Sequence, residues 1–121
     1  MSKLFNSPSG LLRLEGAVVF ISAVGLYSRS DSGWLMFVLL FFVPDVSMVG
    51  YAVNTRLGAT IYNLIHAYAL PAVLGMAGLF TGNALLVSLS LIWFAHIGLD
   101  RWLGFGLKYP TVFKDTHLQR V

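Results

Sequence analysis

Four long apolar blocks dominate the sequence and constrain its fold more than any other feature. Each block is about 20 residues long, the length at which an α-helix crosses the hydrocarbon core of a bilayer. Charged residues make up only 11% of the chain and the mean hydropathy is +0.77, whereas about a quarter of the residues in soluble domains are charged. The sequence therefore predicts an integral membrane protein, a single transmembrane domain over 1–121 with spans at about 11–28, 33–53, 57–79 and 83–104.

The segments between the blocks are short. "SRSDS", "NTR" and "FTG" join successive blocks, so neighbouring helices are expected to lie side by side as hairpins. The fold class predicted from this pattern is an all-α, integral membrane, antiparallel four-helix bundle. Pro44 and Pro71 fall inside the second and third blocks, where proline removes a backbone hydrogen bond and favours a kink. After Gly104, a mixture of aromatic and basic residues predicts a short interfacial C-terminal segment on the cytoplasmic surface.

The positions of Lys and Arg predict the orientation in the membrane. With four spans both termini share one side, and that side collects most of the basic residues, Lys3, Arg56, Lys108, Lys114 and Arg120. The opposite side holds Arg29 beside Asp31. The positive-inside rule therefore places both termini in the cytoplasm. The same bias accounts for the net charge of +3, so no nucleic-acid partner is predicted. The chain has no cysteine, which excludes disulfides and thiolate metal sites.

Five acidic and histidine residues lie inside the apolar blocks, although an ionisable group costs about 2.5 to 3.5 kcal/mol at membrane depth. They are Glu15, Asp45, His66, His96 and Asp100. A rise of about 1.5 Å per helical residue places all five in the cytoplasmic half. Asn63 and His66 share one helix face by their spacing, and so do His96 and Asp100. We therefore expect one polar pocket that opens to the cytoplasm.

The composition of this pocket predicts a divalent metal site. Imidazoles and carboxylates without a thiolate suit Zn, Mn or Fe, and all five pocket residues are candidate ligands. Asn63 and Arg13 are expected to lie next to the ligands. Glu15 is also the candidate general base, and Arg101 is the candidate residue for orienting a phosphate or carboxylate group of a substrate.

Several motifs resemble those of a family of small bacterial four-helix membrane proteins catalogued as a domain of unknown function. They are "RLEG", "PDVSMVGY", "YNLIHAY", "AHIGLDR", "GLKYP" and "DTHL". This resemblance covers nearly the whole chain and implies the inner membrane of a bacterium, but no activity. More distantly, Pro-Asp at the end of a span, followed by His and then H-x-x-x-D, resembles the membrane-bound metal-dependent hydrolase-like family. That resemblance implies metal-binding roles for Asp45, His66, His96 and Asp100; Ser47 stands where the family usually has a second Asp.

Three functions follow from these residues. An enzyme is favoured, a metal-dependent hydrolase acting on a lipid or amphiphilic substrate at the cytoplasmic face. The second function is an ion or proton-coupled transporter or channel, which would require a homo-oligomer because four short helices enclose little room. The third is a haem protein with His66 and His96 as the two axial ligands.

Overall fold

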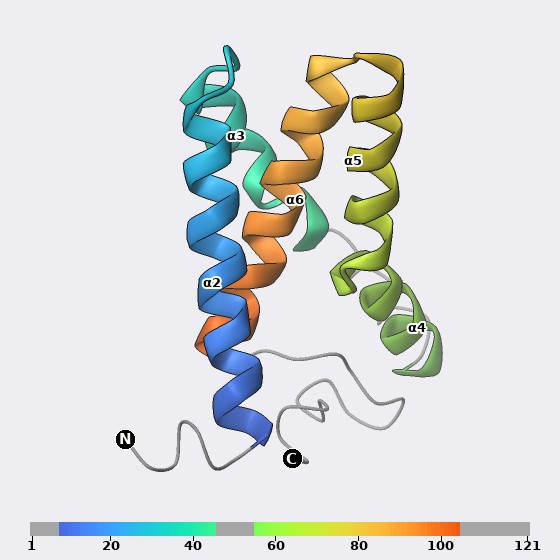
Figure 1. Ribbon diagram of the computed structural model, residues 1–121. Coiled ribbons are helices and arrows are strands. Elements are labelled where there is room, and N and C mark those ends of the chain that lie inside the picture. Colours follow the sequence, from blue (N-terminus) through green and yellow to red (C-terminus); the bar gives the residue numbers. More distant parts are fainter. Residues whose placement is uncertain (1–7, 46–54, 105–121) are drawn as a thin grey trace.

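The computed structural model describes residues 8–45 and 55–104 (Figure 1). Within these residues the regular structure is helical, as predicted. The helices are α2 (Pro8–Ser28), α3 (Trp34–Phe41), α4 (Thr55–His66), α5 (Ala69–Thr81) and α6 (Ala84–Leu103). The chain termini, the predicted interfacial segment after Gly104 and the second part of the second apolar block lie outside the described residues.

Three helical segments are long and apolar enough to cross a membrane. They are Gly10–Ser28, Arg56–Thr81 and Ala84–Leu103, which correspond to the first, third and fourth apolar blocks. The second block contributes the shorter apolar helix Trp34–Asp45. Large apolar side chains on the outward faces of these helices are exposed, among them Ile21, Leu35 and Phe80. These features agree with a membrane protein, in which such faces contact lipid instead of water.

Helix α6 is the central element of the fold. It contacts α2, α5 and α3, and Figure 1 shows it between α2 and α5. A side chain at Gly98 of α6 would lie 2.6 Å from the backbone nitrogen of Phe20, and one at Gly16 of α2 would lie 2.7 Å from that of Trp102. The two backbones therefore approach closely only because both positions are glycine. Gly16 lies early in α2 and Trp102 late in α6, so these two helices run in opposite directions.

The ends of α6 agree with the predicted fourth block. The side chain of Asn83 caps the helix by accepting hydrogen bonds from the backbone nitrogens of Leu85 and Leu86, at 3.1 and 3.2 Å. Gly104 ends the helix with φ 97°, a left-handed conformation that glycine adopts without strain.

The third apolar block forms one apolar helical segment over Arg56–Thr81, as predicted, but it is interrupted at residues 67 and 68, where the sequence predicted only a kink at Pro71. Helix α4 ends at His66 and α5 begins at Ala69. Pro71 explains the break, because it has no N–H group and its ring clashes with the carbonyl group four residues earlier, that of Ala67. The first hydrogen bond of the new helix runs from the nitrogen of Ala72 to the oxygen of Tyr68, at 3.0 Å.

Side chains of α6 satisfy backbone carbonyl groups on both sides of this break. Trp93 Nε1 donates to the oxygen of Ile65 at 2.7 Å, and Arg101 Nη2 donates to the oxygen of His66 at 3.1 Å. Ser90 Oγ donates to the oxygen of Pro71 at 2.7 Å. An unsatisfied carbonyl group is costly in an apolar environment, so these bonds stabilise the interruption. The break thereby leaves His66 as the last residue of α4, held against α6.

A tight turn after α3 positions Asp45. The backbone nitrogen of Asp45 donates to the oxygen of Phe42 at 3.0 Å, and Pro44 between them is buried. Helix α3 is joined to the end of α2 through Tyr27, whose fully buried side chain donates to the oxygen of Gly33 at 2.7 Å. Asp45 is therefore presented by a short, packed turn and not by the interior of a long helix.

Candidate metal centre

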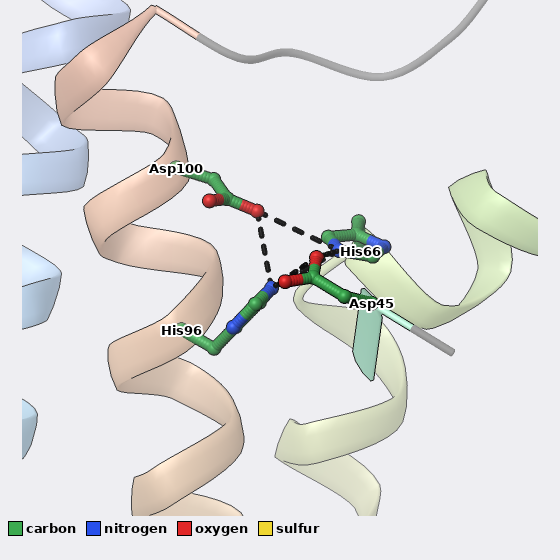
Figure 2. Close-up of side chains that lie close together, drawn as sticks. All are labelled: Asp45, His66, His96 and Asp100. Atoms are coloured by element: carbon green, nitrogen blue, oxygen red, sulfur yellow. Dashed lines mark hydrogen bonds and ion pairs between the residues drawn. The ribbon is translucent and has the colours of Figure 1, made fainter. Parts of the chain in front are cut away.

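Four of the five ionisable residues predicted to form the pocket converge on one point (Figure 2). Asp45 comes from the turn after α3, His66 from the end of α4, and His96 and Asp100 from α6. One possible ligand atom from each residue lies within 4.8 Å of the corresponding atoms of the other three. Three separate segments of the chain thus supply the group.

The distances within the group are nearly equal. His96 Nε2 lies 3.2 Å from Asp100 Oδ2, 3.2 Å from Asp45 Oδ1 and 3.2 Å from His66 Nε2. His66 Nε2 lies 3.5 Å from Asp100 Oδ2 and 3.6 Å from Asp45 Oδ1. No side chain of the four points away from the others in Figure 2. The two imidazole nitrogens therefore lie within 3.6 Å of each other and of one oxygen of each carboxylate.

These separations match the geometry of tetrahedral coordination. Zinc binds imidazole nitrogen and carboxylate oxygen at about 2.0 to 2.2 Å, which places neighbouring ligand atoms of a regular tetrahedron about 3.3 to 3.6 Å apart. The distances above run from 3.2 to 3.6 Å. Two nitrogen and two oxygen donors are also a suitable set for a borderline divalent ion. Five of the six separations in the group therefore suit a tetrahedral divalent cation, and the sixth, between the carboxylate oxygens of Asp45 and Asp100, is at most 4.8 Å.

The hydrogen bonding of His66 leaves its Nε2 lone pair facing the centre of the group. His66 Nδ1 lies 3.0 Å from the backbone oxygen of Tyr62. Because a carbonyl oxygen only accepts hydrogen bonds, Nδ1 is the protonated nitrogen and donates to it. Metal-binding histidines are commonly oriented by such a bond from the other ring nitrogen. The ring of Tyr62 also stacks on the imidazole, with centroids 3.8 Å apart and an angle of 7°, so both the tautomer and the plane of His66 are fixed.

His96 is held by packing more than by hydrogen bonds. It is buried in α6, and the ring of Phe41 contacts it edge-on with centroids 5.2 Å apart. Among residues 8–45 and 55–104, its Nδ1 has no hydrogen-bond partner of normal geometry, although the backbone of Phe41 is close. The neighbours of His96 therefore fix the position of the ring.

The group contains more electron-pair donors than protons. With both aspartates ionised and His66 neutral, three of the four atoms only accept hydrogen bonds, namely the two carboxylate oxygens and Nε2 of His66. Carboxylates held this close would repel each other unless a proton or a cation lay between them. A divalent cation balances both carboxylate charges at once. The charges of the group can thus be balanced by a bound cation or by a proton on His96, whose Nε2 lies 3.2 Å from an oxygen of each carboxylate.

The group is buried on its imidazole side and open on its carboxylate side. The side chains of His66 and His96 are 3% and 2% exposed, whereas those of Asp45 and Asp100 are 39% and 20% exposed. An ion, a water molecule or a substrate would therefore approach past the carboxylates, with Asp45 as the outermost ligand.

The remaining predicted site residues lie around the group or apart from it. Glu15 is exposed on α2 and does not belong to the converging set. Arg101 donates to the backbone oxygen of His66, and its guanidinium carbon lies 5.1 Å from the centre of the Tyr68 ring. Arg13 is exposed, and its Nε donates to the oxygen of Trp102 at 3.1 Å. Asn63 is half-buried on α4, one turn before His66.

Two residues that matter for the site were not predicted from the sequence. Tyr62 orients His66, and the only sequence signal is its position four residues earlier on the same helix face. Trp93 supports the end of α4 through Ile65. That role depends on the helix break before Pro71, so it could be inferred only after the break is known.

Fold and site together define a small helical protein, apolar enough to enter a membrane, with a buried cluster of two histidines and two aspartates. The family model "Domain of unknown function (DUF4260)" matches residues 9–121, and the chain belongs to this family. No curated protein and no solved structure matches the chain. Membership of an uncharacterised family is thus confirmed, whereas the resemblance to the metal-dependent hydrolase-like family receives no support from these comparisons.

Proposed function

We propose that this protein is a membrane-embedded metal-binding protein that holds one divalent cation between Asp45, His66, His96 and Asp100. In this proposal the chain forms an antiparallel four-helix bundle in the bacterial inner membrane, with both termini in the cytoplasm. The observation that carries the proposal is a set of five near-equal distances, from 3.2 to 3.6 Å, that join the two imidazole nitrogens to each other and to one carboxylate oxygen of each aspartate.

Zinc is the cation that fits this geometry best among Zn, Mn and Fe. Tetrahedral coordination by nitrogen and oxygen atoms is typical of zinc, whereas manganese in oxygen-rich sites is octahedral. His66 supports zinc binding further, because its free Nε2 points to the centre while Nδ1 donates to Tyr62.

We further propose that the activity is metal-dependent hydrolysis of a lipid or another amphiphilic substrate. A tetrahedral site with four protein ligands has no open position, so Asp45, the most exposed of the four, would leave the metal when a water molecule takes its place. The bound zinc would then supply a Lewis acid and lower the pKa of that water molecule to about 7. The open carboxylate side gives water and substrate a route to the site, and Asp45 is exposed enough to accept a proton there. Glu15, the candidate base from the sequence, lies outside the converging group, so we assign this role to Asp45. The exposed apolar helix faces favour a substrate that is itself dissolved in the bilayer.

The other two functions have weaker support from the geometry. Two axial nitrogens on opposite faces of a haem iron must lie about 4 Å apart, twice a metal-to-nitrogen bond of about 2.0 Å. His66 Nε2 and His96 Nε2 are 3.2 Å apart, and two carboxylates occupy the space beside them. For transport, a polar path toward the other end of α6 would be needed. Ser88 and Ser90 lie there, but their hydroxyl groups bond to Ser32 and to the oxygen of Pro71.

Element analysis of the detergent-purified protein tests the proposed metal site. We expect about one zinc per chain after purification without chelator, and loss of this zinc in Asp100→Asn and His96→Ala variants. Asp31→Asn is the control, because it makes the same chemical change at an exposed position outside the group. Protein that contains no divalent metal, and binds none when zinc is added, would refute the proposal.

Hydrolysis is tested separately with a chromogenic ester presented in mixed micelles. We expect activity that is removed by a chelator, restored by zinc and strongly reduced in Asp45→Asn. A protein that binds zinc tightly but shows no chelator-sensitive turnover of ester, amide or phosphoester micellar substrates would refute the hydrolase assignment and leave the metal site standing.

A further inference from the structure

We propose that Arg101 is a positioning residue that fixes the metal ligand His66, and that it does not bind an anionic group of a substrate. This inference rests on the proposed metal site. It reassigns the role expected from the sequence, in which Arg101 orients a phosphate or carboxylate group, because the guanidinium is already engaged with the protein.

The first observation is the bond from Arg101 Nη2 to the backbone oxygen of His66, at 3.1 Å. The last carbonyl groups of a helix have no partner within that helix, and the break before Pro71 makes His66 the last residue of α4. A cationic donor is a favourable partner at this end, because it also interacts with the negative end of the helix dipole. The bond thus depends on the break.

The second observation is that Arg101 follows Asp100 directly on α6. Asp100 Oδ2 lies 3.5 Å from the imidazole Nε2 of His66, and Arg101 contacts the backbone of the same residue. Two consecutive residues of α6 therefore lie against His66, Asp100 beside its ring and Arg101 on its main chain. The bond from Arg101 holds the end of α4 next to the face of α6 that carries His96 and Asp100.

The guanidinium is restrained from its other side as well. Its central carbon lies 5.1 Å from the centre of the Tyr68 ring, within the range of a cation–π contact. Gly16 of α2 leaves room for the Arg101 side chain, since an added Cβ there would collide with Arg101 Cβ. Tyr68 lies between α4 and α5, so the side chain of Arg101 links α6 to both the end of α4 and the break itself.

Arg13 provides a matched control within the same protein. Its Nε also donates to a backbone oxygen at 3.1 Å, but the acceptor is Trp102, which supplies no ligand atom to the group. The two arginines thus make the same kind of bond at the same distance, and only one of the two acceptors belongs to a proposed ligand residue.

The test compares zinc and cobalt binding by the full-length wild type and the variants Arg101→Gln, Arg101→Lys and Arg13→Gln in detergent. Zinc affinity is measured by competition with a chromogenic chelator. We expect Arg101→Gln to raise the Kd by about 10 to 100-fold, the usual effect of losing a residue that orients a ligand. Arg101→Lys should recover part of this loss, because lysine keeps a charged donor without the planar group. Arg13→Gln should leave the Kd unchanged.

The visible absorption spectrum of the cobalt-loaded protein reports the geometry of the site independently of affinity. At saturating Co²⁺, the bands of Arg101→Gln should differ from those of the wild type, whereas those of Arg13→Gln should coincide with them. Should Arg101→Gln fail to fold, the Arg101→Lys spectrum and Kd provide the same comparison.

The outcomes separate this inference from the proposed metal site. If the wild type binds zinc and the Arg101 variants keep its Kd and its cobalt spectrum, the positioning role is wrong and the metal site stands. If Arg101→Gln and Arg13→Gln lose affinity equally, the loss reflects general destabilisation and the inference also fails. If the wild type binds neither metal, the metal site itself is wrong, and the positioning role fails with it.

Discussion

Replacement of Asp100 by Asn should abolish the stabilisation of this protein by zinc. Both aspartates approach both imidazoles, and Asp100 is the less exposed of the two, with Oδ2 at 3.2 Å from His96 Nε2 and 3.5 Å from His66 Nε2. Asparagine keeps the shape of the side chain but removes the negative charge and one strong ligand. We therefore expect zinc affinity to fall while the helices still form.

The size of the effect follows from linkage between binding and folding. A ligand that binds only the folded state stabilises it by about 2.7 kcal/mol at a concentration 100 times its Kd, and by about 4.1 kcal/mol at 1,000 times its Kd. If the substitution weakens binding by a factor of about 100, zinc at 100 times the wild-type Kd stabilises the variant by only about 0.4 kcal/mol. The structure supports such linkage, because the ligand residues come from three segments that zinc would connect.

Thermal unfolding in detergent, followed by circular dichroism with and without zinc, measures this difference. We expect zinc to raise the Tm of the wild type and of Asp31→Asn by several degrees, and to leave the Tm of Asp100→Asn nearly unchanged. An equal zinc-dependent rise in Asp100→Asn would show that zinc acts elsewhere on the protein, and the reasoning from these distances would be refuted.

Three further predictions concern pH, packing and topology. Zinc affinity should fall as the pH is lowered, because protons compete with zinc for the two imidazoles; a chelator-competition Kd that does not change as the solution is made acidic would contradict histidine ligation. Gly98→Leu should separate α2 from α6, because even a Cβ there would lie 2.6 Å from the nitrogen of Phe20; a Tm by circular dichroism equal to that of the wild type would contradict this close approach. Reporter fusions at Ser30 and Val121 should lie on opposite sides of the membrane, and an exported C-terminus would overturn the proposed orientation.

The limits of prediction from the sequence are clearest at Glu15. Helical rise gives the depth of a residue, and by depth Glu15 belongs with the four residues that converge. The direction in which Glu15 points around the helix axis depends on which face of α2 packs against other helices. Successive helical residues point about 100° apart, so Glu15 and its neighbour Gly16 face different surroundings. Gly16 faces α6, and Glu15 is exposed. Periodicity in α2 was too weak to reveal this, because lipid-facing and buried positions there are both apolar.

The break in the third block shows a second limit. Pro71 made a kink predictable, since its effect on the preceding turn is local. A complete interruption with His66 as the last helical residue requires donors for the freed carbonyl groups, and these come from Trp93 and Arg101 on another helix. No local pattern in the sequence indicates those partners. In contrast, the ends of α6 were predictable because Asn83 and Gly104 are local caps.

The central position of α6 has a consequence for how the protein is made. This helix supplies two of the four ligand residues of the candidate site and all three side chains that bond to carbonyl groups beside the break, Ser90, Trp93 and Arg101. It is also the last helix of the described chain to leave the ribosome. If the chain enters a bilayer as proposed, then before α6 packs it presents to the lipid exposed carbonyl groups and two of the four proposed ligand residues, Asp45 and His66. Such an intermediate differs chemically from the finished protein, so a membrane protease or chaperone that recognises exposed polar backbone would act on the chain before α6 packs and not afterwards.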